Sequence, residues 1–215
     1  MKKNNPLSIA LIAFGLALIL AGGVLAGCNL WTDARAGEAA QTVMAELTAS
    51  ASSEKRPAVY QMAQADPLVQ ETVIPDHILN PNMDMPEQII DGAAYIGWLE
   101  VPELGLQLPV ITRWNYTDLK TAPCRYKGSV YQDNMIVAGH NYQEHFGKLS
   151  SLAIGDAVIF TDMDGNLFSY RVCDVEVIPE HRIQAMEQGD WDLTLFTCTY
   201  GTESRITARC DRVDN

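Results

Sequence analysis

Residues 156–178 read DAVIFTDMDGNLFSYRVCDVEVI and predict a β-hairpin. Two runs rich in β-branched and aromatic residues, 156–161 and 167–178, flank Asp164-Gly165, a dipeptide typical of the tight turn between antiparallel strands. Apolar and polar residues alternate from Phe168 to Val175, as they do in a strand with one buried face. This hairpin is the clearest sign that the folded part of the chain is built from β-structure.

Further short runs of strand type lie on both sides of the hairpin, and each is bounded by turn-forming residues. They cover residues 95–101, 108–112, 135–138, 193–197 and 206–210. Residues 146–152 predict one short helix, with Leu149 and Leu152 facing inward. Seven or eight short strands with little helix predict a mainly β fold, a closed or nearly closed β-barrel over residues 93–215.

The N-terminus carries a membrane segment. Lys2 and Lys3 precede Leu7–Leu25, an uncharged apolar run of about 19 residues, which is long enough to cross a bilayer core of ~30 Å as a helix. The lysines should stay in the cytoplasm, so the rest of the chain faces outward. Residues 1–28 are either an uncleaved signal anchor or a lipoprotein signal peptide, since Leu25-Ala-Gly-Cys28 resembles a lipobox cut before a lipidated cysteine. Both alternatives tether the domain outside the membrane.

Residues 29–92 predict a helical and linker segment. Residues 34–65 are rich in Ala, Gln and Glu, and the four-residue spacing of Val43 and Leu47 indicates one amphipathic helix or two, ended by Pro67. Residues 74–92 carry three prolines among Asn, Asp and Met, which favours a linker or a loop that wraps the barrel. Residues 53–92 could also shield a site on the barrel.

Charge and cysteine content limit the possible functions. The net charge is −12, and no run of lysine or arginine offsets it, which argues against nucleic acid as a partner. None of the five cysteines has the C-x-x-C spacing of a metal site. Cys124, Cys173 and Cys210 could include one disulfide, but the sequence does not give the pairing. Asp162, Asp164 and Asn166 imitate part of a calcium loop, yet the downstream Glu is missing and a simple turn is favoured.

Three residues at predicted strand ends form a candidate catalytic site. His140 follows the strand at 135–138, Cys198 follows the strand at 193–197, and Arg205 begins the last strand. Strand ends open onto the rim of a barrel, where side chains can converge without being buried. A cysteine thiolate is a nucleophile, an imidazole can exchange its proton, and a guanidinium can stabilise an oxyanion. Spacing alone does not show that the three residues meet.

The amino-acid sequence around these residues resembles that of the sortases. Residues 194–198 (TLFTC), followed by Arg205, resemble the T-L-x-T-C…R signature of that family. Residues 137–141 (VAGHN) resemble the segment around the sortase histidine, residues 95–99 (YIGWL) the first sortase strand, and residues 108–110 (LPV) the second. The four segments occur in the family's order, from about residue 93 to residue 213.

The resemblance implies a sortase-type eight-stranded closed β-barrel with short helices, and a cysteine transpeptidase. Cys198 would attack the Thr–Gly-type bond of a C-terminal sorting signal on a secreted protein and form a thioacyl intermediate. An amine of peptidoglycan or of a pilin subunit would resolve it, with His140 as general acid and base and Arg205 holding substrate and oxyanion. No cofactor is implied. The protein would reside in the bacterial cell membrane with its catalytic domain extracellular.

Several alternatives stay open. A membrane-tethered cysteine endopeptidase would use water as acceptor, and a non-enzymatic surface-binding lipoprotein would keep Cys198 buried and unreactive. The sortase class is open. The Cys-Thr-Tyr-x₄-Arg motif resembles class B sortases, whereas the loop at 179–190 is compact and lacks the helical insertion of that class. Arg209 lies four residues after Arg205, on the same strand face, and is the second candidate for the catalytic arginine.

Overall fold

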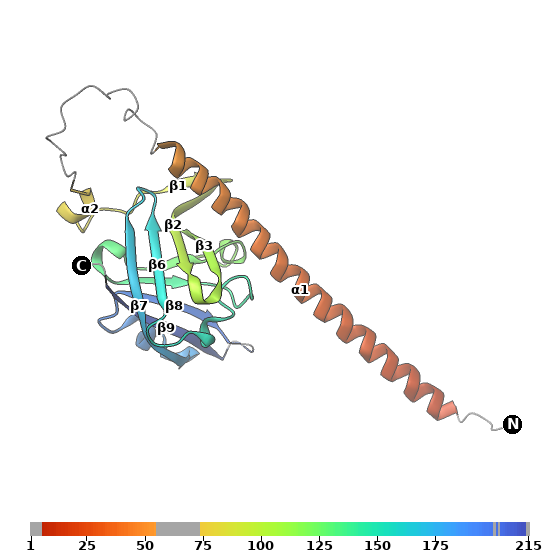
Figure 1. The fold of residues 1–215 in the computed structure, drawn as a ribbon. Helices are drawn as coiled ribbons and strands as arrows, with labels where there is room; N and C mark the ends of the chain where they lie inside the picture. Colours follow the sequence, from red (N-terminus) through yellow and green to blue (C-terminus); the bar gives the residue numbers. More distant parts are fainter. Residues whose placement is uncertain (1–5, 55–73, 200, 202, 214–215) are drawn as a thin grey trace. The chain divides into compact units, whose positions relative to one another are not determined.

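The protein is described from a computed structural model, in which residues 6–54, 74–199, 201 and 203–213 are described. The chain divides into two compact units, residues 1–35 and residues 36–215. Helix α1 (Pro6–Glu54) contributes to both units (Figure 1). All the strands of the described residues belong to the second unit.

The first unit consists of the N-terminal part of α1. Its large apolar side chains, among them Leu11, Phe14 and Leu25, are exposed. Within the described residues, one segment is long and apolar enough to cross a membrane, Ala10–Ser50, and its apolar part overlaps the predicted membrane segment. Past the apolar run, the Arg35 guanidinium lies 4.0 Å from the centre of the Trp31 ring, one helical turn away. Tryptophan and arginine are typical of the border between hydrocarbon and water.

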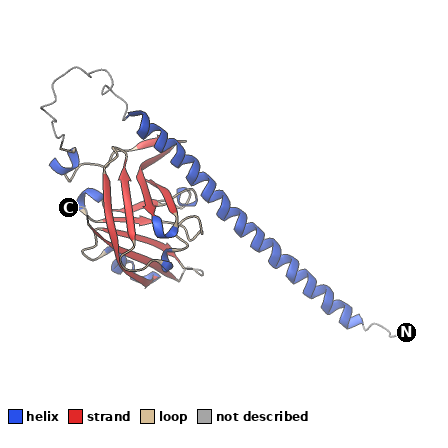
Figure 2. Ribbon diagram, viewed as in Figure 1, coloured by secondary structure: helices blue, strands red, loops and turns tan. Residues whose placement is uncertain are grey.

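Eight strands of the second unit close into a barrel (Figures 1 and 2), which confirms the predicted fold class. Around the barrel they are β2 (Ala93–Val101), β3 (Leu106–Ile111), β4 (Cys124–Lys127), β5 (Met135–Ala138), β8 (Leu193–Cys198), β9 (Ser204–Arg212), β7 (Leu167–Pro179) and β6 (Ala157–Asp162). The ring closes because β6 also pairs with β2. A short strand, β1 (Gln88–Ile90), adds to the edge of β2. The β3–β4 and β5–β8 pairs are parallel, and the other pairs are antiparallel.

Closure depends on a glycine. Gly97 lies in β2 at a register shift, with φ of +149°, and pairs with Asp162 of β6. A Cβ atom at this position would lie 2.1 Å from the Thr161 carbonyl oxygen. Only glycine therefore lets the two strands approach closely enough to seal the barrel.

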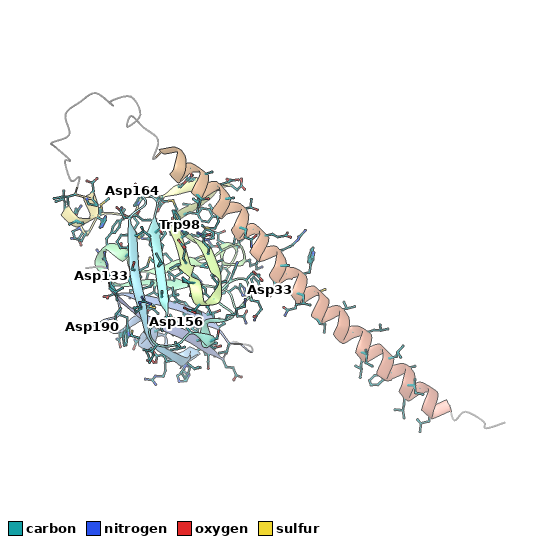
Figure 3. The ribbon with its side chains drawn as sticks, in the orientation of Figure 1. Asp33, Trp98, Asp133, Asp156, Asp164 and Asp190 are labelled. Atoms are coloured by element: carbon teal, nitrogen blue, oxygen red, sulfur yellow. The ribbon has the colours of Figure 1, made fainter. Side chains whose placement is uncertain are left out.

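The predicted hairpin is present as β6 and β7, and a buried carboxylate holds its turn in place. Asp164 lies in the turn (Figure 3). The buried Asp162 carboxylate accepts hydrogen bonds from the Tyr131 hydroxyl (2.7 Å) and from the Asn166 backbone and amide N–H groups (both 2.8 Å). Two of the residues that imitate a calcium loop, Asp162 and Asn166, thus hold the turn in place, and Asp162 joins it to Tyr131.

Helices and turns join the strands. Helix α2 (Asp76–Leu79) and helix α3 (Ile183–Glu187) are short, and 3₁₀ turns occupy residues 102–104, 118–120, 130–132, 149–151 and 180–182. The predicted helix at 146–152 is a 3₁₀ turn, with Leu149 and Leu152 buried as expected. The segment at 74–92 lies along the barrel, because His77 of α2 stacks on Tyr131 at 4.7 Å and Met85 is buried.

Two hydrophobic clusters hold the second unit together. The first fills the barrel and includes Leu193 and Leu195 of β8. The second includes Phe196 of β8 and Ala138 of β5, and by strand alternation it lies on the outer face of these strands. It also includes Val43, Met44 and Leu47 of α1, which together with Ala36 and Ala40 form a buried helical stripe. Residues 34–54 of the predicted amphipathic segment lie within α1, which is continuous with the N-terminal apolar run, and the predicted end at Pro67 lies outside the described residues.

Candidate active site

The register of the sheet brings the predicted histidine and cysteine to one rim. Strands β5 and β8 are parallel, with Ala138 opposite Phe196, and the Gly139 N–H donates to the Phe196 carbonyl (2.9 Å). His140 and Cys198 each lie two residues further on, so they occupy equivalent positions at the carboxyl ends of neighbouring strands. By alternation, both are on the outer face, with Ala138 and Phe196.

The register also places Arg205 beside the cysteine. Cys198 is the last residue of β8, and its Cα partner in β9 is Arg205. The connection between the strands is short and is held by Thr199, whose N–H (2.9 Å) and hydroxyl (3.1 Å) both donate to the Ser204 carbonyl. The three predicted site residues therefore come from the ends of β5, β8 and β9 at one edge of the barrel, and all three are partly exposed.

A compact loop presents the histidine. A Cβ atom on Gly139 would lie 2.3 Å from the Phe146 ring, so glycine at this position lets that fully buried ring pack beneath the loop. The Phe146 N–H donates to the His140 carbonyl (3.1 Å) and closes the loop. On the loop, the Tyr142 ring stacks on the His140 ring.

Cys198 differs from the three other cysteines of the second unit in exposure or in thiol pKa. All five cysteines are free, and Cys198 is half-buried, whereas Cys124 and Cys210 are buried. Burial raises the pKa of the Cys124 thiol to about 12, and it raises the pKa of Cys210 as well. Burial and the nearby Asp211 carboxylate raise the pKa of Cys173 to about 11. These three thiols stay protonated at neutral pH and are poor nucleophiles.

Thiol labelling should reflect this difference. Brief iodoacetamide treatment of the folded protein in detergent at pH 7.5 is expected to modify Cys198 and the exposed Cys28, and to spare Cys124, Cys173 and Cys210. Peptide mapping by mass spectrometry distinguishes the five sites, and labelling in denaturant provides the control for complete reaction. Modification of Cys173 ahead of Cys198 would contradict the assignment of Cys198 as the accessible thiol.

The two candidate arginines have different surroundings. Arg209 is 1% exposed. Its guanidinium pairs with Glu176 (3.0 Å) and donates to the Ala185 and Met186 carbonyls (both 2.8 Å) and to the Thr194 hydroxyl (3.1 Å). Its hydrogen-bonding groups are therefore engaged in holding α3 against the sheet.

Arg205 is not engaged in this way. Within the part of the chain that the structure describes, its buried Nη1 atom has no hydrogen-bond partner. A guanidinium group with a buried and unsatisfied N–H can gain a bond from an added acceptor such as a peptide carbonyl or an oxyanion. The surroundings therefore favour Arg205 over Arg209 as the arginine of the site.

Strand β4 and helix α3 flank the outer face. The Tyr126 ring meets Phe196 edge to face at 5.5 Å, and the Tyr126 hydroxyl donates to Glu187 of α3 (3.0 Å). Lys127 pairs with the same carboxylate at 2.9 Å. The bonds from Lys127 and Tyr126 lower the pKa of Glu187. These contacts join β4 to α3 across the second cluster.

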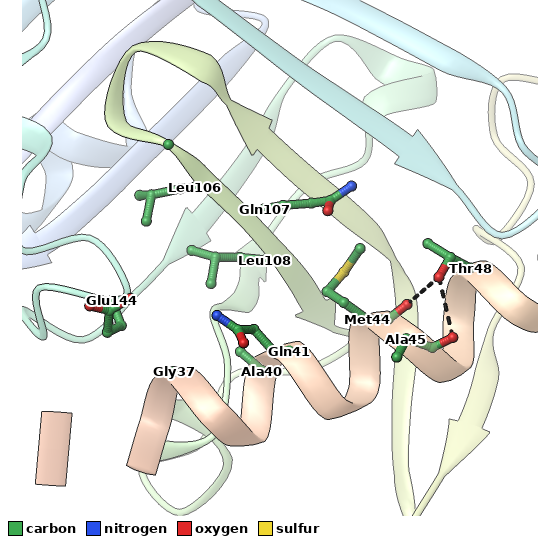
Figure 4. A pocket seen from close by; sticks show the side chains of 11 residues that line it. Gly37, Ala40, Gln41, Met44, Ala45, Thr48, Leu106, Gln107, Leu108 and Glu144 are labelled. Carbon is green, nitrogen blue, oxygen red and sulfur yellow. Dashed lines mark hydrogen bonds between the residues drawn. The ribbon is translucent and has the colours of Figure 1, made fainter. Parts of the chain in front are cut away.

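Two hollows of the second unit are lined by residues of β4 or of the loop that carries His140. One, of about 480 Å³, is lined by residues of β4 and of the chain after β3, including Arg113, Trp114 and Tyr126. The other, of about 370 Å³, lies between α1 and β3 and is drawn in Figure 4. Only Glu144 of its lining comes from the histidine loop, and none of the three predicted site residues lines it.

Some of this arrangement leaves no signal in the sequence. Tyr142, Tyr126 and Glu187 were not predicted as part of the site. They come from a loop, from a four-residue strand of polar composition and from the five-residue helix α3, so no periodic pattern singles them out. Their role depends on which segments the barrel brings together.

A closed barrel with a thiol, an imidazole and a guanidinium at one rim has the groups of a cysteine acyl-transfer site. Residues 99–213 match the family model of the sortase domain. This match covers more than half of the chain, and the chain belongs to the sortase family. Membership in this family implies cysteine transpeptidase chemistry.

Solved structures show the same fold. Sortase A from Corynebacterium diphtheriae is 20% identical, with a TM-score of 0.51, over 57% of this chain and 62% of that one. Sortase C1 of GBS Pilus Island 1 is 18% identical, with a TM-score of 0.50, over 56% of this chain and 65% of that one. The chain thus spans less than two thirds of the length of either relative. No match was found among curated proteins.

Proposed function

We propose that the protein is a membrane-tethered sortase. It cleaves a C-terminal sorting signal of secreted proteins and transfers the acyl group to an amine of peptidoglycan or of a pilin subunit. The observation that carries this proposal is the register of β5, β8 and β9, in which His140, Cys198 and Arg205 share one face at one rim.

In the first half-reaction, His140 accepts the Cys198 proton and the thiolate sulfur attacks the carbonyl carbon of a Thr–Gly-type bond. The carbonyl oxygen becomes an oxyanion, which accepts hydrogen bonds from Arg205. When the tetrahedral intermediate collapses, the C–N bond breaks and His140 donates its proton to the departing amine. The product is a thioester between Cys198 and the new C-terminus of the substrate.

In the second half-reaction, an acceptor amine attacks the thioester carbonyl and His140 removes a proton from the attacking nitrogen. Collapse of the second tetrahedral intermediate releases the Cys198 thiolate and leaves a new amide bond. The thiolate recovers its proton from His140. If water attacks instead, the product is a free carboxylate, and the protein acts as an endopeptidase.

The N-terminal segment supplies the location. With Lys2 and Lys3 in the cytoplasm, residues 7–25 cross the bacterial cell membrane and the catalytic domain, residues 93–215, is extracellular. Residues 1–28 act as a signal anchor or, if cleaved before Cys28, as a lipoprotein signal peptide. Both forms tether the catalytic domain on the extracellular side of the membrane, where secreted substrates emerge.

Product analysis tests this function. The full-length protein in detergent is incubated with a panel of sorting-signal peptides, with and without triglycine. The proposal predicts a cleaved peptide joined to triglycine when the amine is present. Cleavage that yields only the free acid with every amine tried would favour the endopeptidase, and a lack of cleavage together with an unreactive Cys198 would favour a binding protein.

Replacing Arg205 with alanine should lower kcat/KM by about 100-fold, the typical cost of losing one oxyanion donor. The thermal midpoint should hardly change, because Nη1 makes no hydrogen bond within the described residues. The matched control is Arg171→Ala, on the exposed face of β7, which should keep full activity. If the Arg205→Ala variant kept full activity, Arg205 would have no part in the proposed catalytic site.

A further inference from the structure

The rings of His140 and Tyr142 are nearly parallel. Their centroids are 4.2 Å apart and their planes differ by 5°. Both side chains are half-buried, and Tyr142 is two residues after His140 on the loop that ends β5. One face of the imidazole is therefore covered by a phenol ring.

The loop that carries both rings is anchored. The Tyr142 carbonyl accepts hydrogen bonds from the His145 N–H (3.0 Å) and from the Gly147 N–H (2.8 Å). His145 and Phe146 are fully buried. The Tyr142 ring also meets the His145 ring at 5.5 Å. Tyr142 is thus a fixed surface against which a neighbouring side chain can rest.

An imidazole on a partly exposed loop needs such a surface. Rotation about the Cβ–Cγ bond of histidine is broad, because a torsion between tetrahedral and planar atoms has only shallow minima. A parallel stack restricts the plane of the ring but permits a 180° flip. A second contact distinguishes the two ring orientations, since the His140 Nδ1 atom lies 3.4 Å from the Asn141 side-chain oxygen. That oxygen only accepts hydrogen bonds, so it favours the proton on Nδ1 and leaves the Nε2 lone pair for another partner.

We propose that Tyr142 is a positioning residue that fixes the plane of the His140 imidazole for proton exchange with Cys198 and with the leaving amine. The inference rests on the proposed function, because it gives His140 the role of general acid and base. Tyr142 acts through His140, and its ring rather than its hydroxyl is the part that matters. Small errors in the position of a catalytic group reduce rates strongly while substrate binding persists.

The test compares three replacements of Tyr142 in the full-length protein in detergent. Tyr142→Leu and Tyr142→Met remove the planar ring, and Tyr142→Phe keeps it. Leu and Met should lower kcat by about 10- to 100-fold with little change in KM, whereas Phe should stay within about threefold of the unmodified protein. Tyr116→Leu is the matched control, since Tyr116 is 73% exposed. It should leave kcat unchanged.

A spectroscopic readout is independent of activity. With the rings stacked at 4.2 Å, the Tyr142 ring current should shift the His140 ring protons upfield in NMR spectra. This shift should disappear in the Leu and Met variants and persist in the Phe variant. If the unmodified protein shows no Cys198-dependent cleavage, the proposed function is refuted. The NMR comparison of the Tyr142 variants can still be made, because it does not need activity.

Three results would overturn the inference. The first is an unchanged kcat in folded Leu and Met variants. The second is a Phe variant as impaired as the Leu variant, which would assign the effect to the hydroxyl. The third is His140 proton shifts that do not respond to removal of the ring. Thermal midpoints identify any variant that has lost its fold, and the remaining ring-deleting variant then decides.

Discussion

Replacing Cys198 with alanine is expected to lower kcat/KM for sorting-signal peptides by about 10⁴-fold or more. Alanine has no sulfur, so no thioester can form. Catalytic residues act as a unit, so removal of the nucleophile alone usually lowers the rate by about this factor. The rate of peptide cleavage, followed by mass spectrometry, measures the loss. Cys198→Ser should be nearly as inactive, since serine is a far weaker nucleophile near neutral pH.

The fold should survive this change. Cys198 is half-buried at the end of β8, and the connection to β9 is held by Thr199 and Ser204. The matched control is Cys173→Ala, a second half-buried cysteine, whose thiol donates to the Arg209 carbonyl (3.2 Å) on another part of the sheet. It should keep most of the activity. Cleavage by Cys198→Ala at the unmodified rate would contradict the assignment of the nucleophile.

Replacing Arg209 with alanine is expected to lower the free energy of unfolding by about 3 kcal/mol. The loss has two parts: two carbonyl groups of α3 and the Thr194 hydroxyl lose their donor, and Glu176 loses its ion pair. Buried acceptors left unpaired cost about 1–3 kcal/mol each, and breaking a buried ion pair costs about 3–5 kcal/mol, but Glu176 is 41% exposed and recovers water. For a domain of this size the thermal midpoint should fall by roughly 6–12 °C.

The contrast with Arg205 makes this prediction specific. Arg205 and Arg209 lie on the same face of β9, four residues apart, so one change should act on stability and the other on rate. Thermal unfolding of both alanine variants, followed by circular dichroism, measures the difference. An Arg209→Ala protein with an unchanged midpoint would show that α3 does not depend on this guanidinium.

Much of the fold could be predicted from the local pattern of residues. The hairpin at 156–178 has an Asp-Gly turn and alternating strands, and the strand at 135–138 is a short apolar run, so both were predicted close to their actual limits. Strands β1 and β4 were missed. β4 has the sequence CRYK, and only its pairing with β3 and β5 makes these residues a strand.

The site was only partly visible in the sequence. The positions of Cys198, His140 and Arg205 at strand ends follow from composition and from the family resemblance. The parallel pairing of β5 with β8, which puts the histidine and the cysteine in register, joins segments almost 60 residues apart and has no local signal. The Tyr142 stack and the bonds of Arg209 depend on side-chain placement within the folded barrel, so only the structure reveals them.

The measurement that tests the central claim most directly is the intact mass of the protein after brief incubation with a cleavable sorting-signal peptide at low temperature. The account predicts an increase equal to the N-terminal part of the peptide, less one water. Peptide mapping should place it on Cys198, and it should disappear on addition of triglycine as the amide product forms. Steady cleavage with no adduct on Cys198, or an adduct on another residue that triglycine resolves, would contradict it.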